Sequence, residues 1–147
     1  EGDLRPVLER HIKALHLEKH VLLPGFRADI LSFIKSFDVF VMSSLFEGLG
    51  TSLLDAMALS KATVASDTGG IPEVVAHGET GLLVPPRDAR ELASAISTLL
   101  KDPVMAFPAS PKTRCASWAE TGVVEYLSTR ITASGGTARK ASPTSTR

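Results

Sequence analysis

The sequence predicts an α/β domain in which helices flank a parallel β-sheet. Short, uniformly apolar segments alternate along the chain with longer segments whose apolar residues recur at helical spacing. Uniformly apolar runs are typical of strands that are buried on both faces, as in parallel sheets. Gly, Pro, Asp and Glu gather in the loops that follow these runs. Parallel sheets bind their ligands at the carboxyl ends of the strands, so these loops are where a functional site is expected.

The helices are predicted from apolar periodicity together with capping residues. They span 4–17, 29–37, 51–59, a short segment from Pro72, and Asp88 to Leu100. Asp29 and Asp88 are suited to cap the helices that follow them. Pro72 suits the first position of a helix, where its missing amide proton costs nothing.

The strands are predicted at the continuous apolar runs 21–23, 38–42, 62–65 and 81–84. Turn residues such as Pro24 and Gly25 end these runs. Because a helix separates each strand from the next, the strands are expected to run parallel in one sheet.

Composition excludes several classes of function. The 147 residues suit one domain, and 16 Lys and Arg balance 16 Asp and Glu. No net field therefore recruits nucleic acid or an anionic membrane. Cys115 is the only cysteine, which excludes an internal disulfide and fits a cytoplasmic location. No apolar run of this sequence approaches the roughly 20 residues that span a bilayer, and peripheral membrane contact of the parent protein stays open.

The two ends of the chain differ from this pattern. Residues 104–131 contain helix-breaking prolines and form a divergent C-terminal segment, while 132–147 are mostly Ser, Thr, Ala, Gly, Arg and Lys. The tail at 132–147 is expected to be disordered, because it has too little apolar area to offset the entropy lost on ordering. The start at Glu1, without Met, suggests an excerpt from a longer protein.

The loop and helix after 38–42 have features of a phosphate site. Gly48 and Gly50 let the backbone approach a ligand closely and turn sharply into the helix. The first amides of that helix, at Thr51 and Ser52, have no intrahelical acceptor and lie at the positive end of the helix dipole. Such amides are suited to bind an anion.

Two carboxylates flank this turn. Glu47 precedes it and Asp55 follows about one helical turn later, so each could accept hydrogen bonds from sugar hydroxyls. An ordinary glycine turn explains these residues equally well, because Ser52 and Asp55 could form a weak cap and Asp55 is favourable near the start of a helix. Both interpretations stay open on these residues alone.

The segment 47–58 resembles the signature of retaining glycosyltransferases of the GT-B fold, in which two glutamates with seven residues between them precede Ala-Met-Ala. The segments 38–44, 68–75 and 78–86 resemble further motifs of this family, in the same order. The resemblance implies that residues 1–103 are part of a nucleotide-sugar (donor) binding domain. That domain would be a Rossmann-like parallel sheet flanked by helices and lacking its first strands.

The resemblance also implies a role for each site residue. Glu47 would be catalytic and would bind hydroxyls of the donor sugar. Asp55 stands where the family usually has Glu, and its shorter side chain retracts the carboxylate by about 1.5 Å. The implied donor-binding residues are Gly25, Phe26 and Arg27 beside the base, Gly48, Leu49, Gly50, Thr51 and Ser52 at the sugar and diphosphate, and Asp55 at the ribose.

The implied activity is transfer of a sugar from a nucleotide-diphosphate sugar to an acceptor hydroxyl, with retention of configuration. The leaving phosphate would help to deprotonate the acceptor, with no metal and no organic cofactor. The family's acceptor-binding N-terminal domain, and the Arg and Lys that neutralise the diphosphate, would lie before Glu1, so this chain alone is expected to be inactive. The alternatives are a nucleotide-sugar epimerase or a phosphorylase on the same fold, or a non-catalytic nucleotide-sugar-binding subunit.

Overall fold

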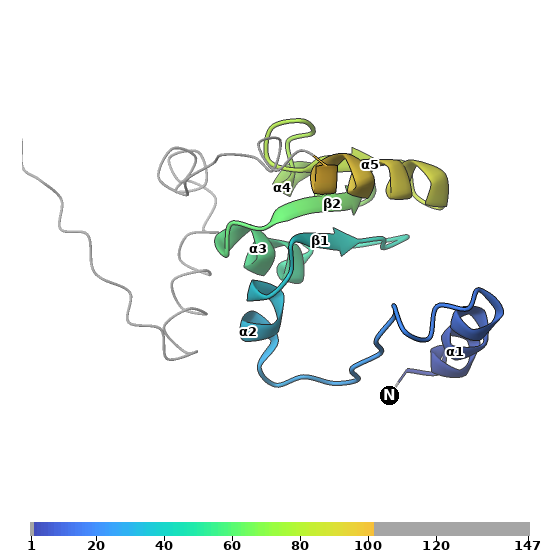
Figure 1. The fold of residues 1–147 in the computed structure, drawn as a ribbon. Helices are drawn as coiled ribbons and strands as arrows, with labels where there is room; N and C mark the ends of the chain where they lie inside the picture. The colour runs from blue at the N-terminus through green and yellow to red at the C-terminus, as the bar shows by residue number, and fades with distance from the viewer. Residues whose placement is uncertain (1, 102–147) are drawn as a thin grey trace, which may run out of the picture. The chain divides into compact units, whose positions relative to one another are not determined.

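The computed structural model describes residues 2–101 (Figure 1). The chain divides into two compact units, Glu1–Ile30 and Leu31–Arg147. The segment 104–131 and the expected tail 132–147 lie outside the described residues.

The second unit contains a parallel sheet of three strands in the order β1-β2-β3. The strands are β1 (Val39–Met42), β2 (Ala62–Ser66) and β3 (Leu82–Val84). In the register, Val39 lies opposite Ala62 and Met42 lies opposite Ala65. The central strand β2 is buried along its whole length, as its apolar composition predicts. The predicted parallel α/β architecture is therefore confirmed.

Helices cover both faces of this sheet (Figure 1). On one face, α3 (Thr51–Ala58) and α4 (Ile71–Val74) form a core with Ala65 of β2. On the other face, α5 (Ala89–Lys101) packs on Ala62 and Val64 of the same strand. Successive residues of a strand point to opposite faces, which explains why neighbours along β2 belong to different cores.

The first unit contains α1 (Arg5–Ala14) and no strand. The prediction of a strand at 21–23 is wrong. A strand requires a neighbour that bonds to its backbone, and no strand of the described residues pairs with this segment. The Val21 amide instead donates to the Leu17 carbonyl at 2.9 Å, and the Leu22 side chain is 77% exposed.

The helix ends follow local chemistry. At the start of α5, the amides of Arg90 and Glu91 donate to Asp88 Oδ1 at 3.0 Å, which confirms the predicted cap. The carboxylate of Asp29, which precedes α2 (Ile30–Lys35), accepts hydrogen bonds from the Arg27 side chain. Within residues 2–101 no helix is both long and apolar enough to cross a membrane.

Candidate functional site

The N-terminus of α3 is open at the carboxyl end of β1. Gly50 precedes the helix with φ 65°, a left-handed conformation that favours glycine. Its carbonyl accepts hydrogen bonds from the amides of Leu53, at 2.8 Å, and Leu54, at 3.2 Å. The amides of Thr51 and Ser52 come before these, and no side chain caps the helix. The first amides of α3 therefore have no side-chain cap, and their binding of an anion stays a prediction.

Glu47 lies in the same loop, between β1 and α3. Its side chain is half-buried, and Glu47 Oε2 accepts a hydrogen bond from Ser44 Oγ at 3.4 Å. The loop around it exposes large apolar side chains: Phe46 is 83% exposed and Leu49 is 52% exposed. The Glu47 carboxylate thus lies in the loop that leads into the uncapped start of α3, and exposed apolar side chains lie on both sides of it in the sequence.

A second loop, at the carboxyl end of β2, holds the Glu47 loop in place. Thr68 Oγ1 donates to the Leu45 carbonyl at 3.1 Å, and the Gly70 amide donates to the Glu47 carbonyl at 3.0 Å. A Cβ atom at Gly69 would overlap the Glu47 carbonyl oxygen. Residues 68–70 therefore lie directly on the backbone that carries Glu47, and only glycine allows this approach.

Asp55 lies one turn into α3 and is 3% exposed. The structure therefore brings Glu47 and Asp55 to the same loop and helix, as the spacing predicts, but gives them different environments. Glu47 is open to solvent on part of its surface, whereas the Asp55 side chain faces the interior. Asp55 belongs to the buried part of α3 together with Leu53, Leu54 and Ala56.

Gly25, Phe26 and Arg27 lie in the first unit. Gly25 has φ 70°, and Phe26 is 93% exposed at a cavity of about 470 Å³ that is lined by residues of the segments 2–8 and 23–26. Arg27 Nε donates to Asp29 Oδ1 at 2.8 Å. This hydrogen bond is the main cause of a raised pKa at Arg27 and of a lowered pKa at Asp29.

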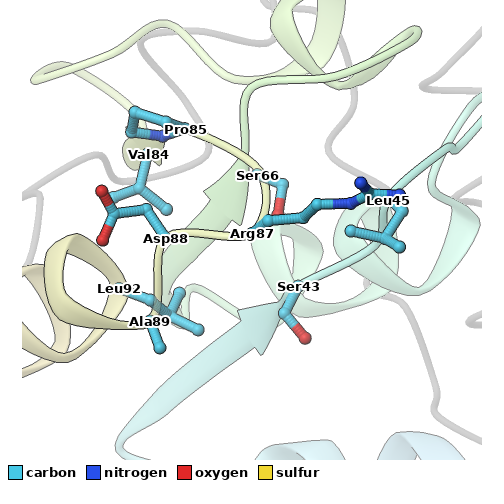
Figure 2. Close-up of a pocket in the computed structure, with 9 residues that line it drawn as sticks. All are labelled: Ser43, Leu45, Ser66, Val84, Pro85, Arg87, Asp88, Ala89 and Leu92. Atoms are coloured by element: carbon cyan, nitrogen blue, oxygen red, sulfur yellow. The ribbon is translucent and has the colours of Figure 1, made fainter.

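A further cavity, which was not predicted from the sequence, lies between the carboxyl ends of the strands and the start of α5 (Figure 2). Its lining residues are Ser43, Leu45, Ser66, Val84, Pro85, Arg87, Asp88, Ala89 and Leu92. A signal was present in the sequence, because Ser43 and Ser66 stand at equivalent places at the ends of two neighbouring strands. Among residues 2–101, no group of three His, Cys, Asp or Glu side chains could hold a metal ion.

Both the sequence and the fold of this chain resemble those of known proteins. Residues 1–102 match the model of the group 1 glycosyl transferases. This chain belongs to the group 1 glycosyltransferase family. It is 36% identical over 105 residues to an alpha-D-kanosaminyltransferase of Streptomyces kanamyceticus, covering 70% of this chain and 27% of that enzyme. It is 47% identical over 93 residues to an alpha-maltose-1-phosphate synthase of Mycolicibacterium smegmatis, covering 55% of this chain and 24% of the synthase.

Solved structures give the same family and fold. The C-terminal domain of the group 1 glycosyl transferase LpcC from Francisella tularensis has a TM-score of 0.65 and 32% identity, covering 71% of this chain and 55% of that domain. Anabaena HepE in complex with UDP-glucose has a TM-score of 0.71 and 32% identity, covering 90% of this chain and 38% of HepE. The fold is that of the C-terminal domain of GT-B glycosyltransferases. The chain spans about a quarter of the length of the two curated relatives above, at 27% and 24%.

Proposed function

We propose that this chain is the donor-binding portion of a retaining glycosyltransferase, which moves a sugar from a nucleotide-diphosphate sugar to an acceptor hydroxyl. The observation that supports this function best is the open N-terminus of α3 behind Gly50, with Glu47 held beside it by residues 68–70. Free amides and a carboxylate in one loop match a ligand that joins a diphosphate to a sugar.

The proposed contacts follow from charge. The diphosphate binds at the amides of Thr51 and Ser52, where the helix dipole favours an anion. The amides of Gly48, Leu49 and Gly50 extend this contact toward the sugar. Glu47 accepts hydrogen bonds from sugar hydroxyls, and these bonds are charge-assisted. As the nucleoside diphosphate leaves, negative charge grows on its phosphates, and preorganised donors stabilise that charge.

The nucleoside end of the proposed donor uses another residue of α3. Asp55 binds the ribose. The solved structures support a uridine nucleotide as a first candidate, because Anabaena HepE was crystallised with UDP, with UDP and glucose, and with UDP-glucose. The proposal includes a cytoplasmic enzyme with a separate acceptor-binding domain and with no metal or organic cofactor.

The test is transfer by the complete protein with UDP-, GDP- and ADP-sugars. Glu47→Ala should lower the transfer rate at least ~100-fold, because a charge-assisted contact made in the transition state contributes a few kcal/mol to the barrier. Glu91→Ala is the matched control, since Glu91 is an exposed glutamate in the first turn of α5 and should leave the rate unchanged.

The product also discriminates between mechanisms. We expect NMR of the product to show the anomeric configuration of the donor. Transfer by Glu47→Ala within threefold of the unaltered rate would rule out the donor assignment. Conversion of the donor sugar without transfer would identify an epimerase.

A further inference from the structure

The cavity against α5 contains a buried hydroxyl without a partner. Ser66, the last residue of β2, is 3% exposed and lines the cavity, which has a volume of about 190 Å³. No hydrogen bond joins its side chain to any other described residue. Buried polar groups in proteins nearly always bond to protein or to water, so the Ser66 hydroxyl is left to bond to whatever occupies the cavity.

The register of β1 against β2 places a second serine, Ser43, next to Ser66. Ser66 points to the α5 face of the sheet, since alternate residues of β2, Ala62 and Val64, pack against α5. Met42 pairs with Ala65, so Ser43 follows β1 at the position next to Ser66. Both serines line the cavity. In Figure 2 the Ser66 oxygen lies on the side of Arg87, whereas the Ser43 oxygen points away from it, so Ser66 is the hydroxyl that a ligand beside Arg87 can reach.

Arg87 supplies a cation at the same cavity. It is one of the few residues other than glycine with a positive φ, at 65°. A positive φ costs free energy in any residue that has a Cβ atom, and residues with such a strained backbone are common at functional sites. Figure 2 shows the Arg87 side chain extending toward Leu45 across the ends of the strands. Within the described residues, its guanidinium makes no hydrogen bond or ion pair.

The neighbouring acid does not neutralise this cation. Asp88 Oδ1 accepts hydrogen bonds from the amides of Arg90 and Glu91. In Figure 2 the Asp88 carboxylate turns toward α5, away from the Arg87 side chain. The groups that can donate hydrogen bonds to a ligand are therefore the Arg87 guanidinium and the Ser66 hydroxyl, while the Asp88 carboxylate also lines the cavity and bonds to the start of α5. Guanidinium groups bind phosphate through paired hydrogen bonds, and serine hydroxyls can complete its contacts.

We propose that this cavity is a second binding site, which takes the phosphate group of a small molecule through Arg87 and Ser66. The cavity lies on the α5 face whereas α3 packs on the opposite face, and the cavity shares Ser43 and Leu45 with the loop that carries Glu47. Its existence does not depend on donor binding at α3. Leu45, Pro85 and Leu92 form an apolar wall for the carbon atoms that bear the phosphate.

The test uses two substitutions that should leave the fold intact. Glycine suits φ 65°, so Arg87→Gly should melt at the same temperature as the unaltered chain or higher. Ser66→Ala removes an unpaired hydroxyl and should not lower the melting temperature either. Both substitutions should nevertheless weaken the site. Arg90→Ala is the matched control, because Arg90 is an exposed arginine in the first turn of α5 that does not line the cavity.

Inorganic phosphate is the probe, titrated into the isotope-labelled 147-residue chain and followed by NMR. We expect saturable shifts at the Arg87 side chain and the Ser66 amide, and no saturation with chloride at equal ionic strength. Arg87→Gly should weaken phosphate binding at least tenfold and Ser66→Ala at least threefold, while Arg90→Ala stays within twofold. Equal affinity in Arg87→Gly, or equal shifts with chloride, would overturn the proposal.

UDP distinguishes the cavity from the donor site. UDP should shift the amides of Thr51 and Ser52 and leave phosphate bound at Arg87. Displacement of phosphate from Arg87 by UDP would make the cavity part of the donor site and would overturn the second site. Absence of shifts at α3, with phosphate still bound at Arg87, would count against the proposed function alone.

Discussion

The contact between residues 68–70 and the Glu47 loop allows a quantitative test with Gly70→Ala. Gly70 has φ −83°, which any residue adopts, so alanine there introduces no backbone strain. Its Cβ would overlap the Gly48 carbonyl oxygen and lie 3.1 Å from the carbonyl carbon. The two loops must then separate by on the order of 1 Å, since buried atoms cannot interpenetrate. That movement breaks the hydrogen bond from the Gly70 amide to the Glu47 carbonyl, now 3.0 Å long.

The expected cost follows from two contributions. Overpacking of a fitted contact costs about 1–3 kcal/mol. Loss of one hydrogen bond adds about 1 kcal/mol. Together they give roughly 2–4 kcal/mol, which corresponds to a ~30- to 700-fold faster hydrogen exchange of the β2 amides. In the complete protein, a displacement of ~1 Å at Glu47 should also lower the transfer rate about 100-fold.

Two other glycines separate the causes of this effect. Gly48→Ala is the neutral control, because a Cβ there meets nothing within 4 Å. Its exchange rates should change by less than about threefold. Gly78→Ala tests backbone strain without crowding, since Gly78 has φ 76° and also has open space around it. We expect a cost of ~1 kcal/mol there. If Gly70→Ala and Gly48→Ala exchange at the same rates, residues 68–70 do not hold the Glu47 loop.

The remaining predictions concern Asp55, the first unit and the tail. Asp55→Glu in the complete protein should preserve or improve affinity for UDP-glucose by calorimetry, at a stability cost of ~1 kcal/mol because Asp55 is buried. Loss of binding in a folded variant would show that the pocket is shaped around Asp, and that the role of the family's glutamate does not carry over to this position. The 147-residue chain should unfold broadly in urea, since 21–23 has no partner strand among the described residues; a sharp two-state transition of a monomer would contradict this. Truncation before Thr132 should leave the melting temperature unchanged, and a fall of several degrees would show that the tail packs.

Much of the second unit was predictable, because local patterns determine it. The uniformly apolar runs 38–42 and 62–65 alternate with helical periods, and this arrangement leaves few alternatives to a parallel sheet. The cap at Asp88 was predictable for the same reason: its carboxylate bonds to amides two and three residues away. The segment 21–23 has the same apolar character but forms no strand, because strand formation also depends on a neighbour elsewhere in the chain.

For the site, the sequence by itself determined the glycine turn, the open helix start and the presence of Glu47 beside them, since all of these lie within one short segment. Only the tertiary structure decided which other residues meet that segment. The contact of residues 68–70 with the Glu47 loop, and the position of Ser43 beside Ser66, depend on the register of β1 against β2. Burial of Asp55 depends on packing across α3. Residues far apart in the chain become neighbours only when strands pair and helices pack, and no local pattern records those distances.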